Sequence, residues 1–431
     1  MRLLLTAHAT AGHTNGLRAI ARRLLARGHS VDFAIASARL PFERLWPGPV
    51  RVASALPSQI AADGCRLVPL APSPAMIWDA ARLPRTRGYD ELTIALRLFT
   101  RGLERHARTM AGHARASGAA AIVADYLMPA AWLAARMARV PFVAFYHSAL
   151  PFPSPAHAPF GSGLRDDAPR DARWREAEQR LDGLSTWLDA RVASACRALG
   201  LAPWRPEALR SPCSPDLNLL ATRAALEPGL EALEGPVEWV GPCLPDAQAV
   251  PDDEAVRTAR AWAGHERVYV SLGTVFDGQP QVLARLLDAL VADHRRILVS
   301  AGASYGALAT RGDARVKVFP RVAQVPLLRE VEVVVTHGGN NTVQETLAAG
   351  RPMIVLPFGG DQIANARRVE RLGVGVALEE GGTDAASVAA AWARLEAMDA
   401  WARARRVAEH GVGDGAEAAA SAIERCIARS R

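Results

Sequence analysis

Residues 331–366, VEVVVTHGGNNTVQETLAAGRPMIVLPFGGDQIANA, have the pattern of a strand, a glycine turn, a helix and a second strand. The run from Val331 to Val335 is β-branched and of strand length, which is typical of a buried strand in a parallel sheet. The glycines after His337 allow a sharp turn and a close approach by another group. A helix should follow, with Asn340, Asn341 and Thr342 as candidate N-caps, and end at Gly350-Arg351-Pro352.

This pattern has two interpretations. A glycine turn that leads into a helix N-terminus can bind a diphosphate through backbone N–H groups and the helix dipole, with His337 beside it. Glu345, about one turn into the helix, could then accept hydrogen bonds from a ribose. The same pattern also fits a plain βαβ unit whose His337 only caps the helix. Asp361-Gln362 follows the next strand, at the sheet edge where open α/β folds bind ligands, and this favours the diphosphate site.

Several of these residues resemble the donor-binding signature of the UDP-glycosyltransferase family. They are His337-Gly338-Gly339, Asn341-Thr342, Glu345, Pro357 and Asp361-Gln362. The resemblance implies an inverting enzyme of α/β class and GT-B fold, with two Rossmann-like domains whose parallel sheets face a central cleft. It further implies a nucleotide-sugar cosubstrate with no metal or other cofactor, sugar contacts from Asp361 and Gln362, and phosphate contacts from Gly273-Thr274.

The composition of the chain argues against several other classes of protein. A chain of 431 residues suits two α/β domains. Its charge of +7 comes almost wholly from arginine, because Lys317 is the single lysine; this argues against a Walker-A ATPase and a Schiff-base enzyme. The arginines form no tract, so we expect no nucleic-acid partner. Five scattered cysteines and no evident signal peptide indicate a cytoplasmic protein, and the lack of an apolar run of membrane-spanning length indicates no integral membrane association. The expected oligomeric state is left open between monomer and homodimer.

The opening strand, turn and helix place a histidine at a sheet edge. The strand Leu3–Thr6 precedes Gly12-His13-Thr14-Asn15-Gly16, which puts His13 just ahead of the expected helix. There is no Gly-x-Gly-x-x-Gly, which argues against a nicotinamide or flavin site. A lone histidine at a helix start is often only a hydrogen-bonded loop residue. Here the segment resembles the family element Gly-His-x-Asn-Pro, whose histidine is the catalytic base, although Gly16 replaces the usual proline.

Asp125 is the expected partner of His13. It follows the strand-like run from Ala120 to Ala124 and precedes a helix. A carboxylate can fix the tautomer of an imidazole base and stabilise the imidazolium, and the family pairs an aspartate at this place with the histidine. Alternatively Asp125 is the N-cap of the following helix, and the two roles are compatible.

The segment Arg321-Val322-Ala323-Gln324 falls where the family has Trp-x-Pro-Gln, the element that holds the nucleotide base. Gln324 matches this element, whereas Arg321 replaces the stacking tryptophan. A guanidinium plane can also stack on a base, so the resemblance still implies base binding here.

Together these features predict an acceptor-binding domain over residues 1–240 and a nucleotide-sugar-binding domain over 241–431, with a linker at about 241–262 and a last helix that packs back on the first domain. Leu217–Ala221 is expected to be the last strand of the first half, and a helix is expected near Glu91–His113. The expected activity is transfer of a sugar from a UDP- or dTDP-sugar to a hydroxyl of a small, apolar natural product. The alternatives are a nucleotide-sugar epimerase, a lipid-linked glycosyltransferase, or a non-catalytic nucleotide-sugar-binding partner protein.

Overall fold

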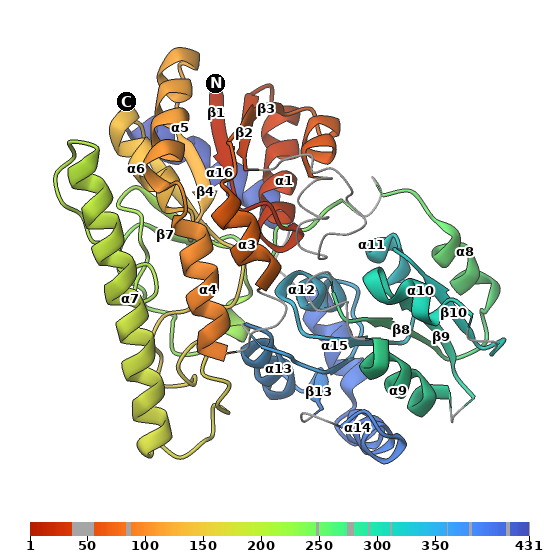
Figure 1. The fold of residues 1–431 in the computed structure, drawn as a ribbon. Coiled ribbons are helices and arrows are strands. Elements are labelled where there is room, and N and C mark those ends of the chain that lie inside the picture. Colours follow the sequence, from red (N-terminus) through yellow and green to blue (C-terminus); the bar gives the residue numbers. More distant parts are fainter. Residues whose placement is uncertain are drawn as a thin grey trace. The chain divides into compact units, whose positions relative to one another are not determined.

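A computed structural model describes residues 1–36, 56–82, 88–246, 250–273, 280–291, 294–310, 313–359, 361–378, 382–410 and 414–430. The chain divides into two compact units, of which the first comprises Met1–Leu244 and Val412–Arg431 and the second comprises Pro245–Gly411. Each unit is built on one parallel sheet (Figure 1). The predicted α/β class with two parallel sheets is therefore confirmed.

The first unit contains a seven-stranded sheet in the order β3-β2-β1-β4-β5-β6-β7. Its strands are β1 (Arg2–Thr6), β2 (Ser30–Ile35), β3 (Arg66–Pro69), β4 (Ile122–Asp125), β5 (Phe142–Tyr146), β6 (Leu217–Leu220) and β7 (Val237–Trp239). The prediction that Leu217–Ala221 ends this half is wrong, because β7 pairs parallel to β6 at the sheet edge. A strand of three residues is too short to show a period of its own.

The helices of this unit are α1 (Ala11–Ala26), α3 (Pro74–Arg82), α4 (Gly88–Thr100), α5 (Leu103–Ser117), α6 (Pro129–Ala138), α7 (Ala172–Ala198), η3 (Ala224–Leu226) and α16 (Gly415–Arg429). The single helix predicted near residues 91–113 is two helices. Gly102 divides them, because its φ of +66° is left-handed and cannot continue an α-helix.

Alternate strand residues of the first sheet face two different helical layers. Leu4 and Ala144 belong to the core beneath α5, α6 and α7, whereas Leu5 and Val143 belong to the core beneath α1 and α16. The last helix, α16, is held on α1 by Arg27, whose guanidinium bonds Glu417, Ser421 and Glu424.

The second unit repeats the same plan with six parallel strands in the order β10-β9-β8-β11-β12-β13. These are β8 (Arg267–Ser271), β9 (Arg296–Ser300), β10 (Val316–Phe319), β11 (Val333–Thr336), β12 (Met353–Val355) and β13 (Gly375–Ala377). Its helices are α8 (Glu254–Ala261), α9 (Pro280–Val291), η4 (Gly302–Ser304), α10 (Tyr305–Leu308), α11 (Gln324–Leu327), α12 (Asn340–Ala348), α13 (Asp361–Arg371), α14 (Ala385–Ala397) and α15 (Ala400–Glu409).

In both units the strand order reverses at one point, between β1 and β4 in the first and between β8 and β11 in the second. Doubly wound sheets bind ligands outside the carboxyl ends of the strands at such a point. The loops that follow these four strands are therefore where each unit should carry its functional residues. Among the described residues, no helix has the length and apolar character needed to cross a membrane.

Candidate active-site residues in the two units

His13 and Asp125 meet at the switch point of the first sheet. His13 lies in the first turn of α1, not ahead of it as predicted, because the helix already begins at Ala11 after the N-cap Thr10. Its Nδ1 is hydrogen-bonded to Oδ2 of Asp125, the last residue of β4. The side chain of His13 is 19% exposed while that of Asp125 is fully buried. The imidazole can thus reach a substrate while the carboxylate that holds it cannot.

Gly16, which departs from the family element, has a packing role in this unit. A Cβ built on Gly16 would lie 2.6 Å from Cζ of Phe145 in β5. Real side chains do not approach this closely, so α1 can rest on the sheet here only because residue 16 has no side chain.

Asp125 is shared by more groups than the sequence indicates. Its Oδ1 accepts a hydrogen bond from the backbone N–H of Leu127 at 2.8 Å. It is not the N-cap of α6, which begins at Pro129 after Met128, so that alternative is wrong. Burial alone would raise the pKa of this carboxyl, but the neighbouring His13 and His147 outweigh burial and hold the pKa well below its usual range. Asp125 is therefore an anion at neutral pH.

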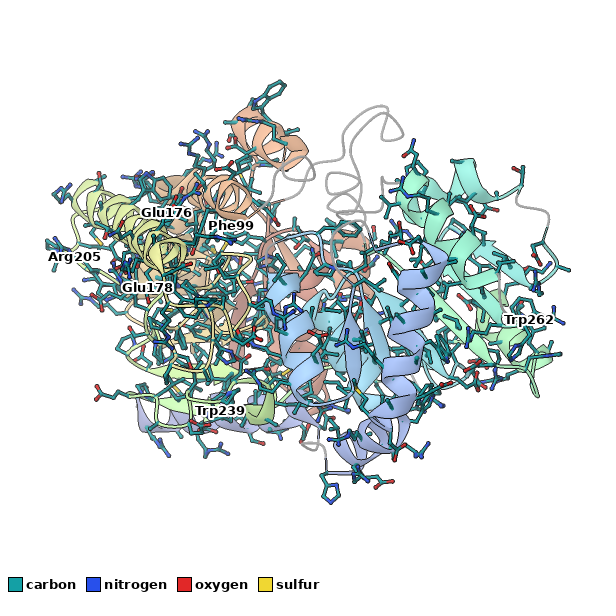
Figure 2. The ribbon with its side chains drawn as sticks, turned by 90° about the horizontal axis from the view of Figure 1, so that it is seen from below. Phe99, Glu176, Glu178, Arg205, Trp239 and Trp262 are labelled. Atoms are coloured by element: carbon teal, nitrogen blue, oxygen red, sulfur yellow. The ribbon has the colours of Figure 1, made fainter. Side chains whose placement is uncertain are left out.

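Two further histidines that sequence reasoning did not assign complete this cluster. His147 directly follows β5, and its Nδ1 lies 3.1 Å from the same Oδ2 of Asp125. His8 follows β1; its Nε2 donates to the backbone oxygen of Leu127 at 2.7 Å, and its ring stacks on that of Phe99 with centroids 3.7 Å apart. Phe99 belongs to α4 and is labelled in Figure 2. Burial, with a smaller contribution from His13, lowers the pKa of His8 to about 3, so this ring is neutral. Both histidines stand at strand ends, which is the feature that could have identified them.

His13, Asp125 and His147 place three possible metal-ligand atoms within 4.8 Å of one another. Nδ1 of both imidazoles lies nearest to the same carboxylate oxygen, Oδ2 of Asp125. This geometry also fits a set of hydrogen bonds centred on the carboxylate.

In the second unit His337 lies between two glycines at the switch point. A Cβ on Gly273, after β8, would lie 2.5 Å from Nε2 of His337, and a Cβ on Gly339 would lie at the same distance from that atom. Burial lowers the pKa of His337 to about 4, opposed by a hydrogen bond to the backbone of Ser271. The imidazole is therefore neutral at pH 7, so it could contact a phosphate only as an N–H donor.

Replacing Gly273 by alanine should displace the His337 ring and weaken binding of a nucleoside diphosphate about tenfold or more, the effect of losing one hydrogen bond to a charged group. The dissociation constant is measured by calorimetry. Gly264→Ala is the matched control, because Gly264 has a similar φ of +88° but no neighbouring atom within 4 Å of a built Cβ. Equal weakening in both variants would assign the effect to backbone strain and not to His337.

The helix after His337 begins with a glycine. Gly339 is the N-cap of α12 and gives it no side-chain hydrogen bond, so the predicted N-caps Asn340, Asn341 and Thr342 lie inside the helix. A helix start without a side-chain acceptor is the arrangement in which an anion can bind the first N–H groups. Gly338 has a φ of +88°, and its built Cβ would lie 2.7 Å from Val355 Cγ1, so only glycine fits the turn.

Glu345 and Gln324 are bonded to each other within the second unit. Nε2 of Gln324 donates to Oε2 of Glu345 at 2.6 Å and lies 3.3 Å from Oγ1 of Thr342. Its Oε1 accepts from the hydroxyl of Tyr269 at 2.9 Å. Burial raises the pKa of Glu345 to about 7, although the bond from Gln324 opposes the rise.

This raised pKa predicts a pH-dependent stability. The folded state binds the Glu345 proton more tightly than the unfolded chain does, so the stabilisation is fully present below the ordinary pKa of 4.5 and is lost as the pH rises through about 7. When the pH is raised from 5 to 8.5, ionisation of Glu345 should decrease the free energy of unfolding by about 2–3 kcal/mol. Glu345→Gln should abolish that difference in urea titrations, whereas Glu409→Gln at an exposed position should retain it. An unchanged pH dependence in Glu345→Gln would contradict the assignment.

Asp361 and Gln362 open α13 and contact the glycine turn region. Oε1 of Gln362 accepts from the backbone N–H of Phe358 at 2.9 Å. Asn365, which sequence reasoning missed, donates to the backbone oxygen of Gly338 at 2.9 Å and to Asp361 at 3.2 Å. The start of α13 is thereby fixed to the turn that follows β11.

The segment expected to bind the base is anchored by Asp253. Oδ2 of Asp253 accepts from the backbone N–H of Ala323 at 2.6 Å, and its Oδ1 caps α8 at Val256. Arg321 is exposed and Val322 is partly exposed. Thr274 lies outside the described residues.

Comparison with known proteins places this geometry in a family. The family model described as UDP-glucoronosyl and UDP-glucosyl transferase matches residues 243–396. The vancomycin aglycone glucosyltransferase of Amycolatopsis orientalis is 30% identical over 333 residues, which cover 74% of this chain and 77% of that protein. The chain belongs to the UDP-glycosyltransferase family. The residues from Arg321 to Gln362 lie inside the region that the family model matches, whereas His13 and Asp125 lie outside it.

Two other glycosyltransferases match this chain over different lengths. NDP-glycosyltransferase YjiC of Bacillus licheniformis is 28% identical over 173 residues, or 40% of this chain and 43% of that protein, so the match spans less than half of that relative. The solved structure of CalG4, the calicheamicin glycosyltransferase, is 18% identical with a TM-score of 0.73 and covers 99% of this chain and 98% of its own. The predicted family and its GT-B fold are thus confirmed.

Proposed function

We propose that this protein is an inverting glycosyltransferase that moves a sugar from a UDP- or dTDP-sugar to a hydroxyl of a small natural product. The observation that carries the proposal is the pair of His13 and Asp125 at the switch point of the first sheet. The similarity to a glucosyltransferase that acts on vancomycin aglycone supports a natural-product acceptor.

In this proposal the first unit binds the acceptor and supplies the base. Because Nδ1 of His13 is bound to the carboxylate of Asp125, Nε2 is the nitrogen that takes the proton of the acceptor hydroxyl. The hydroxyl oxygen attacks the anomeric carbon as the bond from that carbon to the diphosphate breaks, which inverts the anomeric configuration. Asp125 keeps the tautomer of His13 and stabilises the imidazolium that forms.

The second unit would bind the donor. The start of α12 and the neutral His337 would meet the charge of the departing diphosphate through N–H groups. Glu345 would accept hydrogen bonds from the ribose, and Asp361 and Gln362 would hold the sugar hydroxyls. The remaining proposed donor residues, by place in the family elements, are Gly273, Thr274, Arg321, Val322, Gln324, Gly338, Gly339, Asn341 and Thr342.

The proposed role of Arg321 is to stack on the nucleobase. The side chain is exposed, and the Asp253 carboxylate fixes the backbone two residues further on. A guanidinium plane offers the same flat surface as an aromatic ring together with a positive charge.

The test is a turnover assay with the full chain, UDP- and dTDP-sugars, and phenolic and alcoholic acceptors, following release of the nucleoside diphosphate. The proposal expects release that depends on an acceptor and a product of inverted anomeric configuration by NMR. Product with retained configuration would overturn the mechanism. Epimerised donor without transfer would assign the epimerase alternative.

A further inference from the structure

We propose that His147 is a positioning residue that shares Asp125 with His13 and thereby sets the pH at which His13 becomes active as a base. The inference rests on the proposed role of His13 in glycosyl transfer. It is carried by the arrangement of two imidazoles on one oxygen of one buried carboxylate.

The hydrogen-bonding capacity of Asp125 fixes the tautomers of both rings. Oδ1 accepts the backbone N–H of Leu127, so Oδ2 must serve both His13 and His147. A carboxylate only accepts hydrogen bonds, and Nδ1 is the atom of each ring that approaches it, so the proposal places the proton of each ring on Nδ1 in the resting state. The two ring centroids are 4.3 Å apart, which brings the second imidazole directly beside the first.

The other titratable groups around this pair are uncharged. Burial lowers the pKa of His8 to about 3, so this ring beside His13 is neutral. Behind the cluster, burial raises the pKa of Cys213 to about 12 and raises the pKa of Tyr146 well above its usual range. Tyr126 approaches from β4 with its ring centroid 6.2 Å from that of His147. Among the described residues that face this pair, Asp125 is thus the permanent charge, and the two histidines divide its influence.

If one of the two histidine N–H donors is removed from Oδ2, the carboxylate of Asp125 interacts more strongly with the remaining histidine. Without the N–H of His147, the negative charge of Asp125 acts on His13 alone and favours its imidazolium. His13 would then remain protonated, and inactive as a base, up to a higher pH. The acid limb of a plot of kcat/KM against pH reports this protonation in the free enzyme.

Two substitutions separate the hydrogen bond from the packing of His147. In His147→Asn the amide nitrogen can occupy the place of Nδ1 and still donate to Asp125. In His147→Phe the flat ring is kept but the donor is lost. Because His147 is 9% exposed, both variants are first checked for folding by thermal melting.

The experiment measures kcat/KM from pH 5 to 9 for the full-length wild type, His147→Phe, His147→Asn and the exposed control His410→Asn. We expect the acid limb of His147→Phe to move up by about one pH unit, the effect of one charge-assisted hydrogen bond. His147→Asn and His410→Asn should keep the limb of the wild type. An unmoved limb in His147→Phe, or equal movement in both His147 variants, would overturn the proposal.

NMR titration of the ¹⁵N-labelled imidazole of His13 gives the same answer without turnover, so the inference can fail or hold separately from the proposed function. The titration midpoint of His13 should rise in His147→Phe alone. A wild-type activity that is lost on dialysis against EDTA and restored by Zn²⁺ would assign the three side chains to an ion and overturn the proposal.

Discussion

Replacing His13 by alanine is expected to lower kcat/KM by about 10²–10⁴-fold, the range for loss of a positioned general base. The substitution removes the imidazole, which is the partly exposed member of the pair of His13 and Asp125. Asp125 is fully buried and cannot take its place as the base. Acceptors of low pKa, such as nitrophenols, should lose less activity than alcohols because they need less help in giving up a proton. The measurement compares kcat/KM for both kinds of acceptor.

Donor binding provides the internal control for His13→Ala. The proposed donor residues belong to the second unit, so the dissociation constant of the nucleoside diphosphate should change by less than about twofold, within the scatter of surface substitutions. His410→Ala, an exposed histidine, should leave both quantities unchanged. Activity of His13→Ala equal to that of the wild type would refute the proposed mechanism.

The sequence predicted the elements of the sites better than their contacts. His13 and Asp125 could be proposed because each follows a strand and matches a family element. Their positions at strand ends could have marked His147 and His8 as candidates, but their partners could not be assigned, because those contacts depend on the pairing of β1 with β4 and of β4 with β5. The first pairing brings together residues that are more than a hundred positions apart, as in His8 and Leu127, and the second places His147 beside Asp125. The local pattern of hydrophobic residues carries no information about which distant strands pair.

Local chemistry explains the errors in the second unit. Asparagine and threonine are common N-caps, so the run Asn340-Asn341-Thr342 was a reasonable choice. The chain instead uses Gly339, which starts the helix earlier and leaves its N-terminus without a side-chain acceptor. Nothing in the sequence connects Asp253 with Ala323, since an aspartate before a helix is first of all a cap.

Asp125→Asn is expected to reduce kcat/KM by about 10³–10⁴-fold, because it should invert the tautomer of His13. The amide oxygen of the asparagine must occupy the Oδ1 place, where it accepts the N–H of Leu127. Its NH₂ group then faces the imidazoles where Oδ2 was. A donor at that place requires a lone pair on Nδ1 of His13, so the proton moves to Nε2 and blocks the nitrogen that should take the acceptor proton.

The tautomer argument distinguishes this variant from simple damage to the fold. The ¹⁵N spectrum of His13 should change from the Nδ1–H to the Nε2–H form in Asp125→Asn. Asp32→Asn is the matched control, because Asp32 is also buried and also bound by a histidine, His113, at 2.7 Å, but lies in an ion network with Arg2 and Arg66. That variant should lose stability and keep its activity per folded molecule. A folded Asp125→Asn protein with wild-type activity would reduce Asp125 to a structural residue, and His13 would then need another source for its orientation.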